Sequence, residues 1–533
     1  MSGTTTAELR GGQLRTRDVC ALGVGIVVCG QYFGWNLGLL GGGPGGMAVA
    51  SLIVCLLFLV WVLALSELAV ALPRAGGPLD YGQRAGGPWL GFVMAWSMLV
   101  ECLFGTIATA LAAAWYVAFL FNPDQPDPAV VLWAGLGTVA VFFVLQAWGV
   151  KEQSRALTLM TVAAIVALVV YWLVAGSNFS RDRAWPQPDP LAGKGWRGVL
   201  DALPYALWWL IIVEGAALAA EETHQPHRAI PRGLVVAVLT TVGMVTLTLT
   251  LTAGAVPWET VTGDYPLAKV VRDVTGGAGW VAVVFGAMAL FGLLASYHGL
   301  LYGTSRQAFA LGRAGHLPAW VGGVHTTRRT PLPALIVSSG LAAVAVVASV
   351  WFKDAIMVAI LVAGLASLVW YVLAMVCLLR LRRREPSLSH AYRAPLGRLL
   401  PLAVIVLSVF ALVVYVGIDH GLEVLGLAVV LYLLGIGLFA LRRRKGEGPA
   451  ATPALVQPAP PRSPSPWLDR AAGVSLVLAL GVVGWIGAAA VRPDLFRFAA
   501  VEVEMGMSVG VLSVALVLVS AVAVVHTRER RQP

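Results

Sequence analysis

The stretch Gly23–Gly38 reads GVGIVVCGQYFGWNLG and lies within the first long apolar run of the chain. Its central glycines recur at every fourth position, at Gly30, Gly34 and Gly38. The polar residues Gln31 and Asn36 lie between them. Non-helical backbone is tolerated at membrane depth only where it lines a cavity or binds a ligand. We therefore predict a helix that unwinds locally at a binding site. Close packing through spaced small residues is the alternative.

A second irregular stretch, Pro204–Leu218, reads PYALWWLIIVEGAAL. It places Glu214, followed by a glycine, in the middle of an apolar run. An ionisable side chain at that depth costs several kcal/mol and marks a functional site by default. A structural Glu that is hydrogen-bonded to a neighbouring helix is the alternative. Interrupted segments at matching places in two halves of a chain indicate an inverted-repeat transporter.

The composition extends this interpretation to the whole chain. Of its 533 residues, 58% are hydrophobic and 12% are charged, and the mean hydropathy is +0.81. Soluble proteins carry about 25% charged residues. The net charge of +10 comes from short basic clusters between apolar runs, which argues against a nucleic-acid partner. The five cysteines lie in or beside apolar runs, as expected for free thiols.

Apolar runs of about 20 residues, the length of one membrane span, recur along the chain. They predict about 14 transmembrane helices, at 19–43, 47–73, 86–121, 128–149, 155–175, 199–222, 233–256, 279–303, 333–351, 354–380, 399–417, 421–441, 469–490 and 506–526. When the chain alternates sides from a cytoplasmic amino terminus, about three times as many Lys and Arg residues fall inside as outside. This bias predicts an inner-membrane protein with both termini in the cytoplasm.

The chain divides into segments of different composition. A Pro- and Ala-rich stretch predicts a flexible linker between twelve helices and a final hairpin. The predicted segments are a cytoplasmic tail (1–18), a transport core of helices 1–10 (19–380), helices 11 and 12 (381–445), the linker (446–468), the hairpin (469–526) and a cytoplasmic tail (527–533).

Three ordered motifs resemble those of the amino acid–polyamine–organocation permease family. They are SELAVALPRAGGPLDY at 66–81, WWLIIVEGAALAAEETHQPHRAIPRG at 208–233, and ASYHGLLYGTSRQAFALGRAGHLP at 295–318. The resemblance covers roughly residues 18–440. It implies the five-plus-five inverted-repeat fold of the leucine-transporter type, with helices 1 and 6 broken and two further helices. The final hairpin lies outside the resemblance.

Within this family, the ethanolamine permeases look most similar. They share the first-helix motif at 30–36, an acidic residue in the third helix (here Glu101) and the eighth-helix motif at 296–299. Amino acid permeases usually carry Gly-Ser/Thr-Gly in the first helix, whose backbone amides take the substrate carboxylate. Here the stretch reads Gly34-Trp35-Asn36, so that carboxylate site is altered.

These features predict a site for a small amine such as ethanolamine, whose ammonium group needs an anion or an aromatic face. The candidate substrate-binding residues are Gly30, Gln31, Tyr32, Gly34, Asn36, Glu101, Trp208, Trp209, Glu214 and His298. Glu101 is the candidate counter-ion or coupling carboxylate, because it lies in an otherwise apolar run. Plain packing is the alternative for either Trp and for His298.

The resemblance also implies coupling residues. Glu214 is similar to the family's sixth-helix acid, which links substrate binding to proton movement, and Ser296 is the second coupling candidate. Some members of the family carry a fifth-helix Lys where sodium would bind. Residues 157–170 contain no Lys, so proton and sodium coupling both stay open.

The predicted function is therefore ion-coupled symport or exchange of a small amine, best matched by ethanolamine. The alternatives are an amino acid or polyamine permease on the same fold and, more remotely, a transporter-like membrane sensor. No enzyme, cofactor or metal site is expected, because the chain has no zinc-type spacing and no phosphate loop. The expected partners are the substrate and the lipid bilayer. A homo-oligomer is left open.

Overall fold

The computed structural model of the chain describes residues 14–74, 76–148, 150–187, 189, 191, 194–277, 279–326, 328, 330–352, 354–388 and 391–444. The predicted linker (446–468), hairpin (469–526) and carboxy-terminal tail lie outside the described residues, as does most of the predicted amino-terminal tail. Apart from one isolated bridge between Leu14 and Thr223, the described part is helical or irregular.

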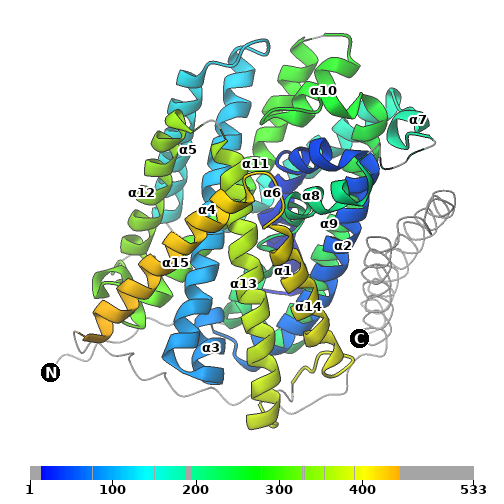
Figure 1. The fold of residues 1–533 in the computed structure, drawn as a ribbon. Helices are drawn as coiled ribbons and strands as arrows, with labels where there is room; N and C mark the ends of the chain where they lie inside the picture. The colour runs from blue at the N-terminus through cyan, green and yellow to red at the C-terminus, as the bar shows by residue number, and fades with distance from the viewer. Residues whose placement is uncertain are drawn as a thin grey trace, which may run out of the picture.

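The helices follow one another with short connections (Figure 1). Their order is α1 (Thr16–Val27), η1 (Val28–Gln31), α2 (Trp35–Ala71), α3 (Pro78–Gly86), α4 (Pro88–Phe121), α5 (Pro128–Trp148), α6 (Val150–Ser177), α7 (Arg181–Ala184), α8 (Gly195–Ala206), η2 (Leu207–Trp209), η3 (Val213–Glu222), α9 (Pro226–Ala255), η4 (Trp258–Thr260), α10 (Pro266–Val274), α11 (Gly279–Arg313), η5 (Ala319–Gly322), α12 (Leu332–Ala348), η6 (Ser349–Trp351), α13 (Ala355–Arg384), α14 (Leu399–Val414) and α15 (Gly421–Arg444). The η elements are 3₁₀ helices.

Ten helical stretches within the described residues are long and apolar enough to cross a membrane, and α14 adds a shorter apolar helix. The chain is therefore an all-helical protein with many membrane spans, as the composition predicts. The short helices α3, α7 and α10 fall in segments that the hydropathy pattern assigned to connections.

The first predicted helix is broken, as its glycines predict. It passes from α1 through η1 to a non-helical turn, and α2 begins only after Gly34, whose φ of 91° is in the left-handed region that favours glycine. The prediction of two separate helices at 19–43 and 47–73 needs a correction. The structure has a kink there, at Gly43 and Pro44, inside the single element α2.

The sixth predicted helix is broken as well. Regular helix ends at Ala206, a short 3₁₀ turn follows, and η3 resumes after Ile212. Ile212 has a φ of 71°, a conformation that is unusual for a β-branched residue. Two breaks in helices that stand five apart support the inverted-repeat prediction, which itself stays a prediction.

The helices pack as two groups. The first helix group consists of α1, α2, α8, η3 and α9, and the second consists of α4, α5, α6, α11, α12 and α13; packing is densest within each group. In Figure 1, α4, α11 and α13 occupy the centre, with α5 and α12 on one side and α2, α8 and α9 on the other. Both helix breaks belong to the first group.

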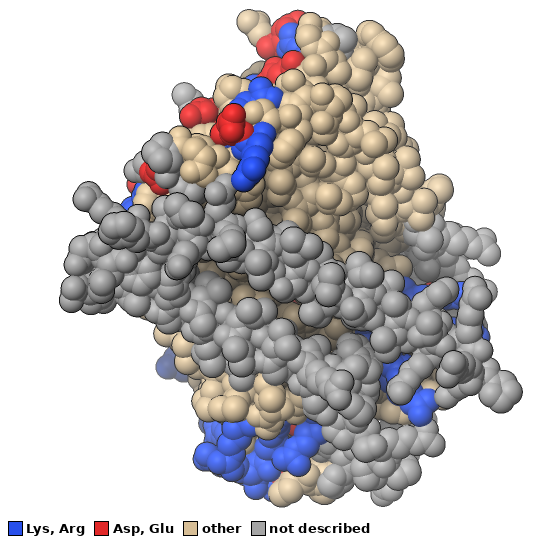
Figure 2. All heavy atoms as spheres, turned by 90° about the vertical axis from the view of Figure 1, so that its right-hand side faces the viewer, with Lys and Arg blue, Asp and Glu red and all other residues tan. Residues whose placement is uncertain are grey.

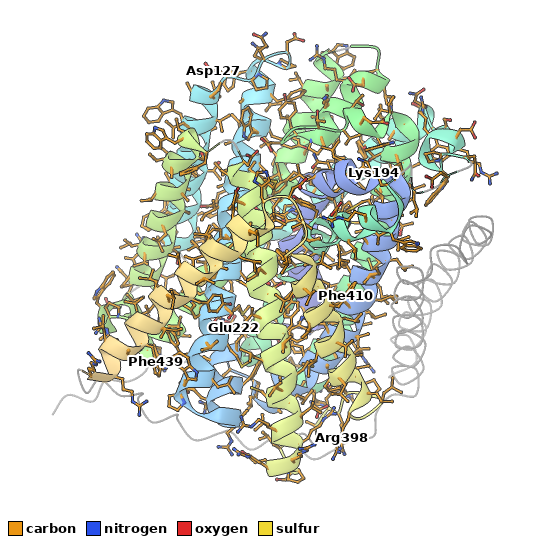
Figure 3. All side chains as sticks on the ribbon, in the orientation of Figure 1. Asp127, Lys194, Glu222, Arg398, Phe410 and Phe439 are labelled. Carbon is orange, nitrogen blue, oxygen red and sulfur yellow. The ribbon has the colours of Figure 1, made fainter. Side chains whose placement is uncertain are left out.

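The two ends of the helices differ in charge. Lys and Arg side chains gather at the lower end in Figure 2, whereas acidic side chains appear at the upper end together with basic ones. Figure 3 labels Arg398 at the lower end and Asp127 and Lys194 at the upper end. We call the lower end the basic end, defined by the arginines that close α13 and α15, Arg382–Arg384 and Arg442–Arg444.

Candidate functional site

Two buried carboxyl groups meet between the helix groups. Glu101 lies in the middle of α4, and Glu214 lies in the first turn of η3, directly after the break in the sixth helix. Their exposed fractions are 0% and 1%. The two side chains lie close enough to interact electrostatically. The structure thus brings together two acidic residues that are far apart in the sequence.

Adjacent aromatic residues of α13 each donate one hydrogen bond to this carboxyl pair. Trp370 Nε1 donates to Glu101 Oε2 over 2.6 Å, and the Tyr371 hydroxyl donates to Glu214 Oε1 over 2.5 Å. Trp61 of α2 stacks on Tyr371, with ring centroids 4.1 Å apart, and meets Trp370 edge-on at 4.9 Å. The two residues that donate to the carboxyl pair are therefore packed against a third aromatic ring, that of Trp61.

The second oxygen of each carboxyl group has no donor. Among the described residues, no N–H or O–H lies in hydrogen-bonding geometry to Glu101 Oε1 or Glu214 Oε2. Among the described residues, the indole N–H of Trp208 is also buried without an acceptor. Buried polar atoms are normally paired, so these atoms are candidates to contact a ligand or a proton.

The breaks of the first and sixth helices contact each other at Trp208. A Cβ atom at Gly30 would lie 2.6 Å from the Trp208 carbonyl oxygen, and one at Gly34 would lie 2.7 Å from the Trp208 ring. Trp208 also meets Phe33 edge-on, with ring centroids 5.2 Å apart. Both interpretations of the spaced glycines thus apply, since the backbone is unwound and also closely packed.

Trp209 packs against α2. Its ring stacks on Trp35, with centroids 5.0 Å apart, and its N–H donates to the Ser51 hydroxyl over 2.9 Å. These contacts attach the sixth-helix break to α2.

Asn36 stabilises the backbone of the first break. Its side-chain oxygen accepts from the Gly34 N–H over 3.0 Å, and its amide donates to the carbonyl oxygens of Val261 and Gly263. The Gly34 amide is therefore already paired. This amide belongs to the stretch Gly34-Trp35-Asn36, where the sequence predicts that the carboxylate site of amino acid permeases is altered.

Gln31 and Tyr32 point toward neighbouring helices. The Gln31 side-chain oxygen accepts from Thr248 of α9 over 3.0 Å, while its amide nitrogen has no partner. The Tyr32 hydroxyl donates to the Ala164 carbonyl of α6 over 2.6 Å. The structure does not gather these two side chains around the carboxyl pair.

Ser296 and His298 lie on different faces of α11. The Ser296 hydroxyl donates to the Gly25 carbonyl over 3.0 Å and accepts from the Cys29 N–H over 2.9 Å, so it holds the first helix just before its break. His298 instead faces α5, where Gln146 donates to its carbonyl oxygen and Phe142 lies against its ring. His298 is placed away from the carboxyl pair.

Sequence reasoning missed Trp61, Trp370 and Tyr371. Aromatic residues are common in apolar spans, so none of them stands out singly. The usable signal was the adjacent pair at 370–371, two side chains with polar donors in one predicted span.

The basic end of the site is closed. Arg306 of α11 contacts Glu222 at the end of η3 over 3.5 Å, with both side chains largely buried. Backbone hydrogen bonds join Leu14 to Glu222 and His224. The segment before α1 is thus tied to the segment after η3.

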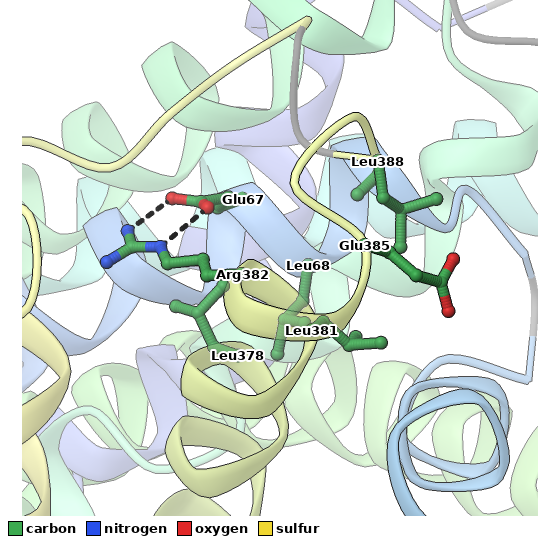
Figure 4. A pocket seen from close by; sticks show the side chains of 8 residues that line it. Glu67, Leu68, Leu378, Leu381, Arg382, Glu385 and Leu388 are labelled. Atoms are coloured by element: carbon green, nitrogen blue, oxygen red, sulfur yellow. Dashed lines mark hydrogen bonds and ion pairs between the residues drawn. The ribbon is translucent and has the colours of Figure 1, made fainter.

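At the opposite end, Asp264 lies in the connection before α10. Burial, reinforced by the negative charge of Asp354, raises the pKa of Asp264 to about 6. Among the described residues there is no group of three or more His, Cys, Asp or Glu side chains that could hold a metal ion. The cavity drawn in Figure 4 lies at the basic end, between α2 and α13, and is not lined by Glu101 or Glu214.

Broken membrane helices that meet beside buried carboxyl groups define a protein that handles a polar solute inside the bilayer. The sequence profile of the amino acid permease family matches residues 14–424, and the chain belongs to this family. It is a transporter and not an enzyme.

Individual relatives agree with this assignment. An uncharacterized transporter of Rhizobium meliloti is 32% identical, over 63% of this chain and 74% of its own. The branched-chain amino acid permease of Bacillus subtilis is 24% identical, over 81% of this chain and 93% of its own. A probable GABA permease of Pseudomonas aeruginosa is 25% identical, over 83% of this chain and 96% of its own.

Proposed function

We propose that this chain is a secondary active transporter of a small solute that carries an ammonium group, and that this group binds at Glu101 and Glu214. The observation that carries the proposal is the buried carboxyl pair with two oxygens that receive no hydrogen bond from the protein. Among the described residues, no Lys or Arg forms an ion pair with either carboxyl group.

The charge of the pair matches a singly charged cation. Two ionised carboxylates side by side in a buried site repel each other and lose their hydration. One proton shared by the pair leaves a single negative charge. An ammonium group neutralises that charge, and the nearby rings of Trp61 and Trp370 offer faces for a cation. In this proposal, substrate and proton occupy the site together, so the transport is proton symport.

The relatives favour an amino acid as the substrate class. Two of those described above are named for branched-chain amino acids and for GABA, and both match most of this chain. A carboxylate-free amine such as ethanolamine is the second candidate, because the Asn36 side chain already occupies the Gly34 amide. Both candidates share the ammonium group that the carboxyl pair would bind.

The orientation belongs to the same proposal. The basic end, with its arginines at the ends of α13 and α15, would face the cytoplasm by the positive-inside rule. The closed contact between Arg306 and Glu222 would then be a cytoplasmic gate.

Uptake into proteoliposomes tests the proposal. Labelled leucine, GABA, arginine and ethanolamine are each supplied with an inward proton gradient or an inward sodium gradient. We expect proton-driven uptake of at least one, and a loss of about 100-fold in Glu101→Gln, because removing a buried charge partner typically costs several kcal/mol. Glu385→Gln, at a partly exposed carboxylate of the basic end, is the control. Sodium-driven uptake, or normal uptake by E101Q, contradicts the proposal.

A further inference from the structure

A buried ion pair joins α2 to α13 at the basic end. Arg382 Nε donates to Glu67 Oε1 over 2.8 Å, and Arg382 Nη2 donates to Glu67 Oε2 over 2.5 Å. The Glu67 side chain is 0% exposed and that of Arg382 is 7% exposed. The planar guanidinium matches both carboxylate oxygens at once, the strongest geometry that such a pair adopts.

The same carboxylate also holds the connection that follows α13. The Ala394 N–H donates to Glu67 Oε2 over 2.6 Å, and Arg382 donates to the Gly397 carbonyl. The Tyr392 hydroxyl donates to a backbone carbonyl of α2 over 3.3 Å. Glu67 thus receives three hydrogen bonds from α13 and the chain that leads to α14.

A small pocket lies beside this ion pair. The cavity in Figure 4 lies next to it and is lined by Glu67, Leu68, Ala71, Leu378, Leu381, Arg382, Glu385 and Leu388. Figure 4 shows the two dashed contacts between Arg382 and Glu67 at one side of these leucines. The ion pair of Arg382 and Glu67 therefore bridges α2 and α13 next to this pocket.

The ion pair crosses the boundary between the two helix groups. α2 packs with α8 and α9 in the first group, whereas α13 packs most extensively on α4 in the second. α13 also carries Trp370 and Tyr371, which contact the carboxyl pair. Eleven residues of continuous helix separate Tyr371 from Arg382, about 16 Å along the axis. A shift of α13 at one position is therefore transmitted to the other.

We propose that Glu67 and Arg382 form a latch that fixes α13 to α2 while the basic end is closed, and that the latch opens when the two helix groups move apart. The proposal rests on the transport function proposed above. Buried ion pairs are weak evidence for stability, because desolvation offsets their attraction. A contact between two separately packed groups, beside a cavity, is suited to being made and broken.

Thiol accessibility tests the latch without any transport. Ala71 lines the cavity, so Ala71→Cys reports its opening. The reporter is placed in a Cys20→Ser background, since Cys20 is the one native cysteine among the described residues that is not fully buried. Labelling by N-ethylmaleimide is measured on purified full-length protein. We expect Glu67→Gln to raise the labelling rate about tenfold or more. Arg382→Lys keeps the positive charge but loses the two-pronged hydrogen bonding of the guanidinium, so it should raise the labelling rate less.

The control is the ion pair of Arg272 with the exposed Asp124, at the opposite end of the protein and away from the cavity. Asp124→Asn should leave the labelling rate unchanged. The double variant E67Q/R382Q contains no uncompensated charge, but it also lacks the latch contact. Its labelling rate should therefore stay as high as that of E67Q. Three results would each overturn the proposal: a labelling rate in E67Q equal to that of the parent, an equal rise of the rate in D124N, or a return to the parental rate in the double variant.

Transport gives the second readout. With whichever solute is taken up, E67Q should lower kcat at least tenfold and leave KM within about threefold, because Glu67 does not touch the substrate site. A rise in KM with kcat unchanged would instead show a role in binding. If no solute is taken up, the transport proposal fails while the labelling result still decides whether the latch exists.

Discussion

At the scale of single residues, the proposed site depends on how Glu214 is held. The Tyr371 hydroxyl donates a hydrogen bond to Glu214 over 2.5 Å, and both residues are buried. Tyr371 and Trp370 come from the second helix group, whereas Glu214 belongs to the first. The hydrogen bond therefore reports directly on the arrangement of the two groups at the site.

Tyr371→Phe should raise the KM for the transported solute about tenfold, since removing one buried partner leaves Glu214 Oε1 unsatisfied. The measurement is concentration-dependent uptake into proteoliposomes. Tyr415→Phe is the matched control, because it removes a buried hydroxyl that donates to the Leu361 carbonyl, and it should leave KM unchanged. Equal effects of the two variants would show that the Tyr371 hydroxyl has no particular role at the site.

A second residue-scale prediction concerns Asp264, whose pKa is raised from its usual 3.8 to about 6 by burial. The folded protein therefore binds this proton more strongly than the unfolded chain does between pH 4 and pH 6. Stability from this group is fully present below about pH 4 and is lost as the pH rises through 6. As the pH is raised from 5 to 7, the melting temperature of the Asp264→Asn variant should fall less than that of the parent protein. Identical pH profiles of the two proteins would contradict this assignment.

The sequence predicted part of the site at this scale. Glu101 and Glu214 were predicted because acidic residues in apolar runs are costly. Trp370 and Tyr371 were not, since their importance comes only from what they face. Ser296 and His298 are two positions apart, about 200° around a helix, so they lie on different faces. The linear motif cannot show which of these two side chains points toward the site.

At the scale of elements, the two helix breaks have different causes. Gly34 permits the first break, because it adopts a φ of 91° and leaves room for Trp208. The sixth helix breaks at Ile212, where no glycine is present, so composition gave only the polar Glu214 as a signal. Its break is imposed by surrounding structure and was harder to predict.

Gly34→Ala should destabilise the protein by about 2 kcal/mol or more. The added Cβ would lie 2.7 Å from both Ile360 and Trp208, and the positive φ strains any L-residue. Thermal unfolding in detergent is the measurement. Gly243→Ala is the control, because a Cβ there meets nothing within 4 Å inside α9, and it should leave stability equal or slightly higher. A neutral effect of G34A would show that the break tolerates a side chain.

At the scale of the whole molecule, hydropathy predicted the spans but not their grouping. Twelve predicted spans fall on described helices, with a kink instead of a turn at Gly43 and Pro44. The division into two helix groups depends on contacts between segments distant in sequence, such as α4 with α11 and α13. The polar contacts between the groups, at Glu214, Glu67 and Glu222, mark where transport would rearrange the protein.

The central claim is that one ammonium group and one proton share the site of Glu101 and Glu214. A pH-sensitive dye sealed inside proteoliposomes tests it most directly, without an imposed proton gradient. Adding the transported solute outside should acidify the lumen, with about one proton entering per solute molecule. Glu214→Gln should abolish the acidification, since it removes one of the two carboxyl groups that hold the proton. Uptake of the solute with no change of luminal pH, or unchanged acidification in E214Q, would contradict the account.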